Sequence, residues 1–253
     1  MPIACLGRGL ASRRAHHLSL RHLGGRGVSA AAARRTSKPI APIEPAWFQP
    51  GGQAVVIGVD PDISGAVAVL RWTMRPLPLE LEACPSPLDD VVAEVHDMPV
   101  ETWALGKRAK RQACAASLLA LFRGSTATAL AAGDAVHAAV EHNTPPHMCG
   151  KFAWYGIGYS TGVLTGVLEA AGVPHERVSA SRWKSDLGLR KQGKVGSLML
   201  ARSLFPGVSL ARKKDHGRAE ALLIAAWAMG LRLPQQQPAE AEAAGAEATA
   251  AEE

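Results

Sequence analysis

The sequence predicts one mixed α/β domain in which a sheet is flanked by helices. Two apolar runs, 55–59 and 66–70, are joined by a short polar turn and are rich in β-branched residues, as buried strands are. Segments of strand character then alternate with segments of helical periodicity, the clearest of which covers 219–230. This alternation over about 180 residues indicates a single domain of ordinary size.

The expected elements follow from hydrophobic periodicity and from Pro and Gly breaks. After the first hairpin they are a strand at 91–97, a helix at 112–123, a strand at 135–141, a helix within 156–172, a short strand near 174–178, a turn or helix from 181, and helices at about 195–205 and 219–230, the last stopped by Pro234.

The two ends of the chain differ in composition from the middle. Residues 1–50 are rich in Ala, Ser, Pro and Arg with a single acid, Glu44, which is typical of an organellar transit peptide followed by a Pro-rich linker. A basic arm that binds nucleic acid is the alternative. Residues 235–253 carry acids and almost no large apolar side chain, which predicts a disordered tail. The folded domain is therefore expected at 51–234.

The formal net charge of +6 is mostly that of the leader, so the folded part is only mildly basic. Such a charge allows a nucleic-acid partner without requiring one. The four scattered cysteines form no CxxC pair, which argues against a disulfide framework or a zinc site. No apolar run approaches the length of a membrane span, so no membrane partner is expected, and no motif indicates a small-molecule cofactor.

Three carboxylates stand where predicted elements end or begin. Asp60 and Glu141 end apolar strands, Asp215 precedes the last helix, and Glu220 lies within that helix. Acids at adjacent strand ends and at the start of a helix can converge, and converging carboxylates repel one another unless cations neutralise them. Mg²⁺ suits such oxygen ligands, and two ions could support phosphodiester hydrolysis.

Each acid also has a purely structural interpretation. Asp60 could begin an Asx-type turn with Pro61, Glu141 could pair with a surface base, and Asp215 could complement a helix N-terminus. Glu220 could be an ordinary exposed helical residue. Each signal is weak when taken alone, and only the joint arrangement is moderately specific.

Several of these segments together resemble a known family. The resemblance covers about residues 53–232 and rests on Ile57-Gly58-Val59-Asp60-Pro61-Asp62-Ile63-Ser64-Gly65, His96-Asp97-Met98-Pro99, Glu141, Trp183-Lys184 and the segment 215–222. These residues resemble the RuvC branch of the ribonuclease H-like nucleases, and more closely the plant and algal Monokaryotic Chloroplast family of Holliday-junction resolvases.

The resemblance implies a ribonuclease H-like sheet and an endonuclease that makes paired symmetric nicks in four-way DNA junctions as a homodimer. It implies two Mg²⁺ ions, with Mn²⁺ as a substitute, bound by Asp60, Glu141, Asp215 and Glu220. Lys184 and Lys194 fall where the family places basic residues near junction phosphates. Arg190, Lys191, Lys107 and Arg108 extend these basic patches. The implied location is the chloroplast stroma or nucleoid, and composition alone leaves the mitochondrion open.

The chain departs from the bacterial pattern at two places. Asp62 stands where the bacterial proteins have Gly, which adds an acid beside the site. The bacterial C-terminal ligands are three residues apart, whereas His216 and Glu220 are four apart and Asp215 and Glu220 five. Asp215 is favoured as ligand because a hard cation prefers carboxylate, and His216 is kept as a candidate general base. A ribonuclease H-like protein that binds branched DNA without cutting it, and a less structure-selective nuclease, are the alternative functions.

Overall fold

The computed structural model describes residues 45–47, 49–74, 87–105, 108–142 and 150–232, all within one compact unit. Its strands are β1 (Gln53–Asp60), β2 (Ala66–Thr73), β3 (Val91–Asp97), β4 (Val100–Leu105), β5 (Arg108–Ala113), β6 (Ala135–His142) and β7 (His175–Ser179). Its helices are α1 (Ala115–Ala132), α2 (Lys151–Ala170), α3 (Ala180–Asp186), α4 (Gly193–Leu204) and α5 (His216–Ala228). The tail and nearly all of the leader lie outside the described residues, so the domain boundaries stay predictions.

A five-stranded mixed sheet in the order β3-β2-β1-β6-β7 forms the centre of the domain. Strand β2 runs antiparallel to both of its neighbours, β1 and β3, while β6 is parallel to both of its neighbours, β1 and β7. Strand β1 is therefore central and is buried along both faces after its first residue. A central strand covered on both sides needs a continuous apolar run, which 54–59 supplies. The predicted α/β class, a mixed sheet flanked by helices, is confirmed.

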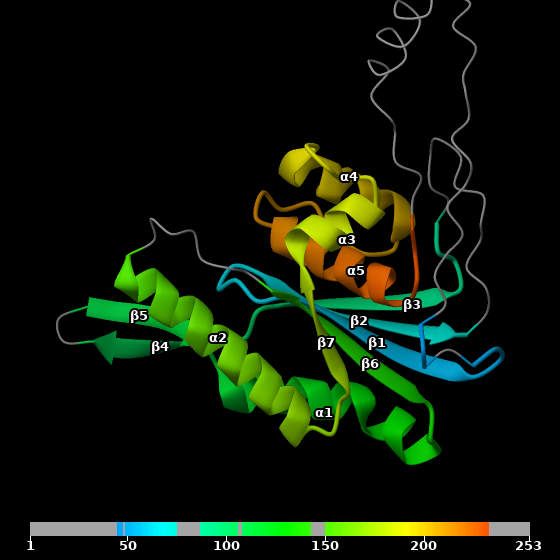
Figure 1. Ribbon diagram of the computed structural model, residues 1–253, viewed down its shortest axis with the longest axis horizontal. Coiled ribbons are helices and arrows are strands. Elements are labelled where there is room, and N and C mark those ends of the chain that lie inside the picture. The colour runs from blue at the N-terminus through cyan, green and yellow to red at the C-terminus, as the bar shows by residue number, and fades with distance from the viewer. Residues whose placement is uncertain (1–44, 48, 75–86, 106–107, 143–149, 233–253) are drawn as a thin grey trace, which may run out of the picture. The chain divides into compact units, whose positions relative to one another are not determined.

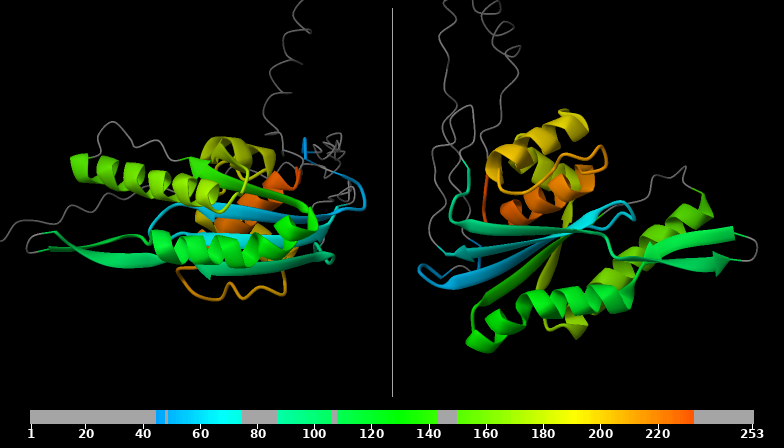
Figure 2. Two further views of the ribbon diagram at one scale, coloured as in Figure 1. Left: turned by 90° about the horizontal axis from the view of Figure 1, so that it is seen from below. Right: turned by 180° about the vertical axis from the view of Figure 1, so that it is seen from behind.

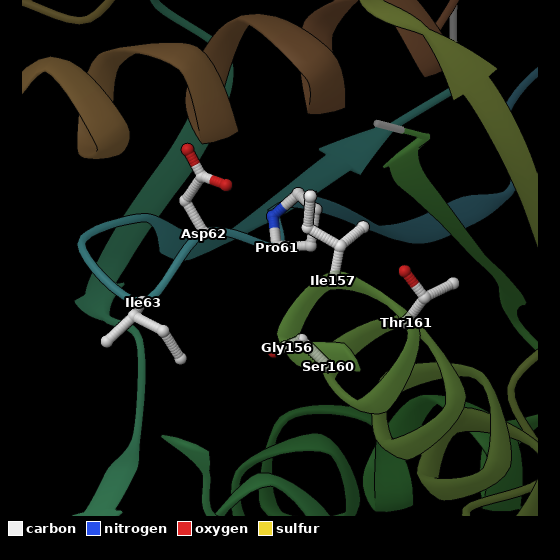
Figure 3. Close-up of a pocket in the computed structure, with 7 residues that line it drawn as sticks. All are labelled: Pro61, Asp62, Ile63, Gly156, Ile157, Ser160 and Thr161. Carbon is white, nitrogen blue, oxygen red and sulfur yellow. The ribbon is translucent and has the colours of Figure 1, made fainter. Parts of the chain in front are cut away.

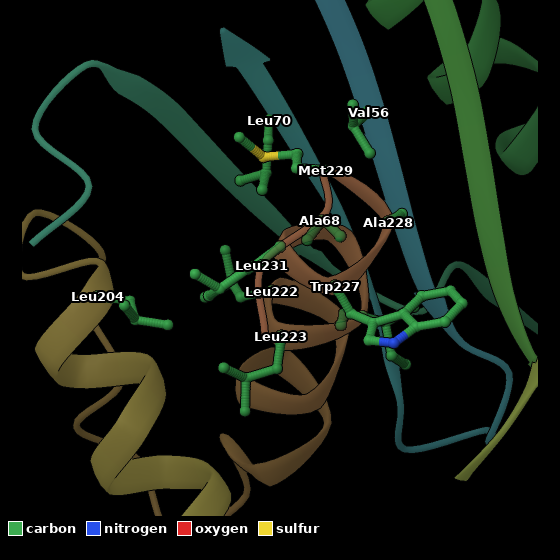
Figure 4. Close-up of a cluster of buried hydrophobic side chains, with 14 of the residues drawn as sticks. Val56, Ala68, Leu70, Leu204, Leu222, Leu223, Trp227, Ala228, Met229 and Leu231 are labelled. Atoms are coloured by element: carbon green, nitrogen blue, oxygen red, sulfur yellow. The ribbon is translucent and has the colours of Figure 1, made fainter. Parts of the chain in front are cut away.

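Helices cover both faces of this sheet and form two separate hydrophobic cores. Figures 1 and 2 show α3, α4 and α5 on one face and α1 and α2 on the other. Alternate residues of β1 point into each core: Val56 belongs to the core that contains Leu222 and Leu223 of α5 (Figure 4), whereas Ile57 belongs to the core that contains residues of α1 and α2. The period-two alternation of the strands is thus matched by apolar faces on both helical layers.

A second, two-stranded sheet between β3 and α1 was not predicted. Strands β4 and β5 pair in antiparallel register from Val100↔Ala113 to Leu105↔Arg108 and extend away from the main sheet (Figure 1). The predicted helix start at Gln112 is wrong, because Gln112 belongs to β5 and donates a hydrogen bond of 2.8 Å across the hairpin to Glu101. Helix α1 begins instead at Ala115 and runs to Ala132.

The remaining helices are in the predicted places with shifted ends. Helix α2 begins at Lys151, five residues before the expected segment, and α4 covers Gly193–Leu204. The turn or helix predicted from 181 is the short helix α3. Helix α5 ends at Ala228, before Pro234, because Gly230 follows with a positive φ of 104° that ends the helical conformation.

Helix α1 passes the length and composition test for a membrane span within the described residues, with a mean hydropathy of 1.3. A segment of this length and hydropathy was not predicted. The apolar side chains of Leu118 and Phe122 are fully buried in the core under the sheet. A helix that packs on a soluble core can pass the same test, so the absence of a membrane partner stays a prediction.

Candidate active site

Asp60 is the last residue of β1 and is only 6% exposed. Its Oδ1 accepts a hydrogen bond from the backbone N–H of Asp62 at 3.2 Å, and the N–H of Gly65 donates to the carbonyl of Asp62 at 2.8 Å. A Cβ on Gly65 would collide with the Asp60 backbone, so only glycine allows the turn to close this tightly. The Asx-type turn predicted as the structural role of Asp60 is present, and it leaves the second carboxylate oxygen available to other partners.

Glu141 lies beside Asp60 on the neighbouring strand. The parallel register of β1 and β6 pairs Val59 with Val140, so the next residue of each strand is an acid. Glu141 is 5% exposed, and its Oε2 accepts a hydrogen bond of 2.8 Å from the indole Nε1 of Trp183. The backbone pairing of the two parallel strands therefore fixes the positions of Asp60 and Glu141 relative to each other.

Glu220 is brought to the same place because α5 lies unusually close to the sheet. A Cβ on Gly58 of β1 would collide with the carbonyl of Ala221 and the backbone nitrogen of Ala225. A Cβ on Gly217 would likewise lie 2.6 Å from the carbonyl oxygen of Ser64, in the turn after Asp60. Glycine at these two positions therefore sets the distance between α5 and the strand that carries Asp60.

Glu220 is paired with a base. Its Oε1 lies 2.8 Å from Nζ of Lys184, and the hydroxyl of the buried Ser197 lies 3.5 Å away. The ammonium group of Lys184 lies 4.9 Å from the ring centroid of Trp183. Lys184 thus supplies positive charge to this acidic site from α3.

The negative charges of these acids act on one another's pKa values. The pKa of Asp60 is raised to about 7, first by burial and then by the charge of Asp62, with smaller contributions from the charges of Glu141 and Glu220. The hydrogen bond from the Asp62 N–H acts in the opposite direction. Burial also raises the pKa of Glu141, which the Trp183 hydrogen bond opposes and the charge of Glu220 reinforces. Asp60, Glu141 and Glu220, with Asp62 beside them, therefore form one acidic cluster that lacks enough positive charge.

Asp215 is held by other partners. It precedes α5, is 1% exposed, and accepts hydrogen bonds of 2.7 Å from both the backbone N–H and the Nε of Arg212. Its side chain does not cap α5. His216 follows it, and the buried Nδ1 of His216 has no hydrogen-bond partner among the described residues. The choice between Asp215 and His216 as a fourth ligand stays open.

Asp97 joins Asp215 in an ionic network that the sequence analysis did not assign to the site. It ends β3 and accepts from Arg212 at 2.8 Å and 3.1 Å and from Arg218 at 2.5 Å, with Lys214 at 3.4 Å. Hydrogen bonds from Arg212 and Arg218 hold the pKa of Asp97 well below its usual range. The available signal was an acid at a strand end followed later by a basic segment, 212–214.

No group of three or more His, Cys, Asp or Glu side chains within the described ranges has the arrangement of a formed metal site. The chemistry of the donors nevertheless fits a hard divalent cation, because Asp60, Glu141 and Glu220 offer carboxylate oxygens in a cluster that lacks positive charge. Lys184 and Ser197 both contact Oε1 of Glu220, so Oε2 is the oxygen through which Glu220 would bind a cation.

The predicted DNA-binding residues lie in different surroundings. Arg190, Lys191 and Lys194 are exposed where α3 leads into α4, and Lys191 has a left-handed φ of 63°. Lys184 is the member of this set that contacts the acids. Lys107 lies outside the described residues, and only the backbone of Arg108 is described, at the start of β5.

A small pocket and an aromatic surface flank the site on the side of α2. The pocket lies between the turn after Asp60 and the first half of α2, and Figure 3 shows Asp62 at its edge with the carboxylate pointing away from α2. Further along, Phe152, Trp154 and Tyr155 are 46–60% exposed, and Lys110 of β5 lies 5.5 Å from the Tyr155 ring centroid. This surface was not predicted; its sequence signal is the run of aromatic residues at 152–155, and only the fold brings Lys110 of β5 beside it.

Comparison with characterised proteins gives one strong sequence match. Over 89 residues, 34% of this chain, the sequence is 51% identical to the Holliday junction resolvase MOC1, chloroplastic, of Chlamydomonas reinhardtii. The matched region is 10% of that protein's length. The resemblance to the Monokaryotic Chloroplast resolvases is confirmed over this segment. No protein-family model matches the chain.

Two solved structures of RuvC from Thermus thermophilus are also similar to the chain. One is a complex with a Holliday junction substrate, with 16% identity and a TM-score of 0.40, and the other has 17% identity and a TM-score of 0.39. Each alignment covers 68% of this chain and 90% of the RuvC chain.

Proposed function

We propose that this chain is a divalent-metal-dependent endonuclease that resolves four-way DNA junctions. The observation that carries the proposal is the cluster of the buried Asp60 and Glu141 with the partly buried Glu220, in which burial and mutual repulsion raise the pKa of Asp60 to about 7. Such a cluster destabilises the fold unless it serves a charged ligand. The match to a protein named as a Holliday junction resolvase supports the choice of substrate.

The carboxylates are assigned as metal ligands. Asp60, Glu141 and Glu220 would hold Mg²⁺, with Mn²⁺ as a substitute, and two ions per site are proposed. When bound, divalent ions supply an activated water and stabilise charge on the leaving oxygen in phosphodiester hydrolysis. The chain itself fixes the acids on β1, β6 and α5 and excludes bulk water from Asp60 and Glu141. Either Asp215 or His216 completes the set, and His216 is the candidate general base.

Basic residues near the cluster would bind the DNA backbone. Lys184 lies against Glu220, and Arg190, Lys191 and Lys194 are exposed on the adjoining connection, with Lys107 and Arg108 as further candidates. Contacts to phosphates supply affinity that depends on salt but little sequence information. A homodimer is proposed because a four-way junction offers two equivalent strands, which two symmetry-related sites can cut in pairs.

The proposed location is the chloroplast. The relative's name states that location, and the Arg-rich, acid-poor leader is typical of a transit peptide. Import of a fluorescent fusion to residues 1–50 into plastids would support this assignment. Import into mitochondria alone would contradict it.

The test uses the full chain with a four-way junction, a linear duplex of the same arm sequence and an RNA–DNA hybrid, with Mg²⁺ or with EDTA. We expect paired nicks in the junction only, dependent on Mg²⁺ and abolished in Asp60→Asn. Asp89→Asn is the matched control, because Asp89 is exposed and precedes β3 at the end opposite Asp97. Its activity should equal that of the unchanged chain.

The alternatives give different results in the same assay. Tight junction binding without cutting under any metal condition would identify a non-cleaving branched-DNA-binding protein. Equal cutting of all three substrates would identify a less selective nuclease. To separate the fourth-ligand candidates, Mg²⁺ affinity is compared between Asp215→Asn and His216→Asn, and the true ligand is the one whose loss weakens it.

A further inference from the structure

Trp183 is a buried residue that contacts the acidic cluster from the core side. Strand β7 pairs with β6 so that Val178 lies opposite Glu141. The chain then turns into α3, whose first turn is fixed by a hydrogen bond from the Arg182 N–H to the Ser179 hydroxyl at 3.4 Å. This path returns Trp183, fully buried, to Glu141, where its indole N–H donates to Oε2 at 2.8 Å.

The chemistry of this hydrogen bond constrains Glu141. An indole N–H is only a donor, so the oxygen it contacts must accept. The bond therefore stabilises the ionised carboxylate against the cost of burial and leaves Oε1 as the oxygen available to a ligand. Because the indole ring is fully buried in the hydrophobic core on the α5 side of the sheet, its donor is held in one position.

The next residue acts on the other side of the cluster. Lys184 contacts Glu220 at 2.8 Å, and its ammonium group lies over the Trp183 ring. One turn of α3 thus contacts an acid of the sheet through Trp183 and an acid of α5 through Lys184. The Lys184 side chain is 31% exposed, whereas Trp183 is fully buried.

We propose that Trp183 is a positioning residue that fixes the orientation of the Glu141 carboxylate and keeps it ready to bind a divalent cation. This inference rests on the proposed function of the site. Outer partners that orient metal ligands typically contribute about 10- to 100-fold to metal affinity.

The chain offers a close control for the test. Trp227 of α5 is also buried, at 3% exposure, and its indole N–H also donates to a carboxylate, Asp186, at 2.8 Å. That carboxylate is outside the acidic cluster. Trp183→Phe and Trp227→Phe therefore remove the same kind of donor and similar core volume, but only the first affects Glu141.

The experiment measures Mg²⁺ and Mn²⁺ affinity of the full-length protein without DNA, by calorimetry and by electron paramagnetic resonance of free Mn²⁺. We expect Trp183→Phe to weaken affinity about 10- to 100-fold and Trp227→Phe to stay within about twofold. Equal affinities in the two variants would overturn the proposal. Because no DNA is present, the result is separate from junction cleavage, whose failure would instead count against the proposed function.

A second measurement keeps the proposal testable if Trp183→Phe does not fold. In the ¹⁵N spectrum of the otherwise unchanged protein, the Trp183 indole N–H resonance should shift on Glu141→Gln substitution and on Mg²⁺ addition. The Trp227 indole resonance should stay in place in both cases. A Trp183 resonance that responds to neither change would overturn the proposal.

Discussion

Asp60→Asn should make the metal-free protein more stable, although it should abolish cleavage. Asp60 is buried beside other acids, and its pKa is raised from 3.8 to about 7. The Asp60 carboxyl group therefore binds its proton more tightly in the folded state than in the unfolded state. For such a group, the free energy of unfolding falls as pH rises from about 4 through about 7, and the penalty is complete above that range. Asparagine keeps an oxygen to accept the Asp62 N–H but carries no charge.

The size of the effect follows from the two pKa values. Each unit of pKa corresponds to about 1.4 kcal/mol, so the ionised Asp60 costs up to about 4 kcal/mol at pH 8 and roughly 2 kcal/mol at pH 5. The stabilising effect of Asp60→Asn should therefore grow by about 2 kcal/mol between these pH values. For a chain of this size, that growth corresponds to roughly 4–8 °C in Tm.

The assay is urea and thermal unfolding in EDTA at pH 5 and pH 8, with Asp89→Asn as the control for loss of an exposed charge. Saturating Mg²⁺ should raise the stability of the unchanged protein and have little effect on Asp60→Asn, because a ligand stabilises only the state that binds it. A stability difference that is zero, or equal at both pH values, would refute the assignment of a strained, buried acid.

Three further predictions concern the surroundings of the cluster. Gly58→Ala should lower the free energy of unfolding by about 1–3 kcal/mol and weaken Mg²⁺ affinity, because the new Cβ collides with the backbone at Ala221. The control is Gly124→Ala, which adds a Cβ in open space on α1 and should be neutral or stabilising in the same denaturant titration. Asp97→Asn should lower Tm at pH 7, because hydrogen bonds from two arginines hold the pKa of the folded Asp97 carboxyl well below its unfolded value. The Tm difference should begin to shrink as pH falls below about 4 and vanish only below the folded pKa, so a difference as large at pH 2 as at pH 7 would contradict the network. Lys194→Gln should weaken junction binding on all sequences and reduce its salt slope by about one while leaving Mg²⁺ affinity unchanged, and an unaltered slope would remove Lys194 from the DNA contacts.

The acids of the site could be found from sequence because strand ends are local features. Asp60 and Glu141 each lie at the end of an apolar strand, and the two strands are parallel neighbours, so their carboxyl ends lie at the same edge of the sheet. Glu220 also follows from the pattern of its helix. The partners of these acids could not be predicted, because Lys184 reaches Glu220 and Trp183 reaches Glu141 only through strand pairing and helix packing across long sequence separations.

The hairpin of β4 and β5 is an element that could not be predicted from the sequence. Its second strand is basic and lacks a run of large apolar residues, so the sequence favoured a charged segment leading into a helix. What makes it a strand is pairing with β4, including the contact from Gln112 to Glu101. Such pairing is a property of two strands together rather than of either one.

The sequence by itself determined the mixed sheet, the central buried strand and the acid at its end. These features depend on hydrophobic periodicity and on the Pro and Gly residues that end helices and strands, and both are properties of short segments. Only the tertiary structure decided which acids share one environment. The close approach of α5 at Gly58 brings Glu220 to Asp60, while Arg212 holds Asp215 in a separate ionic network. Electrostatic coupling depends on distance and burial, and these are fixed only when the helices pack on the sheet.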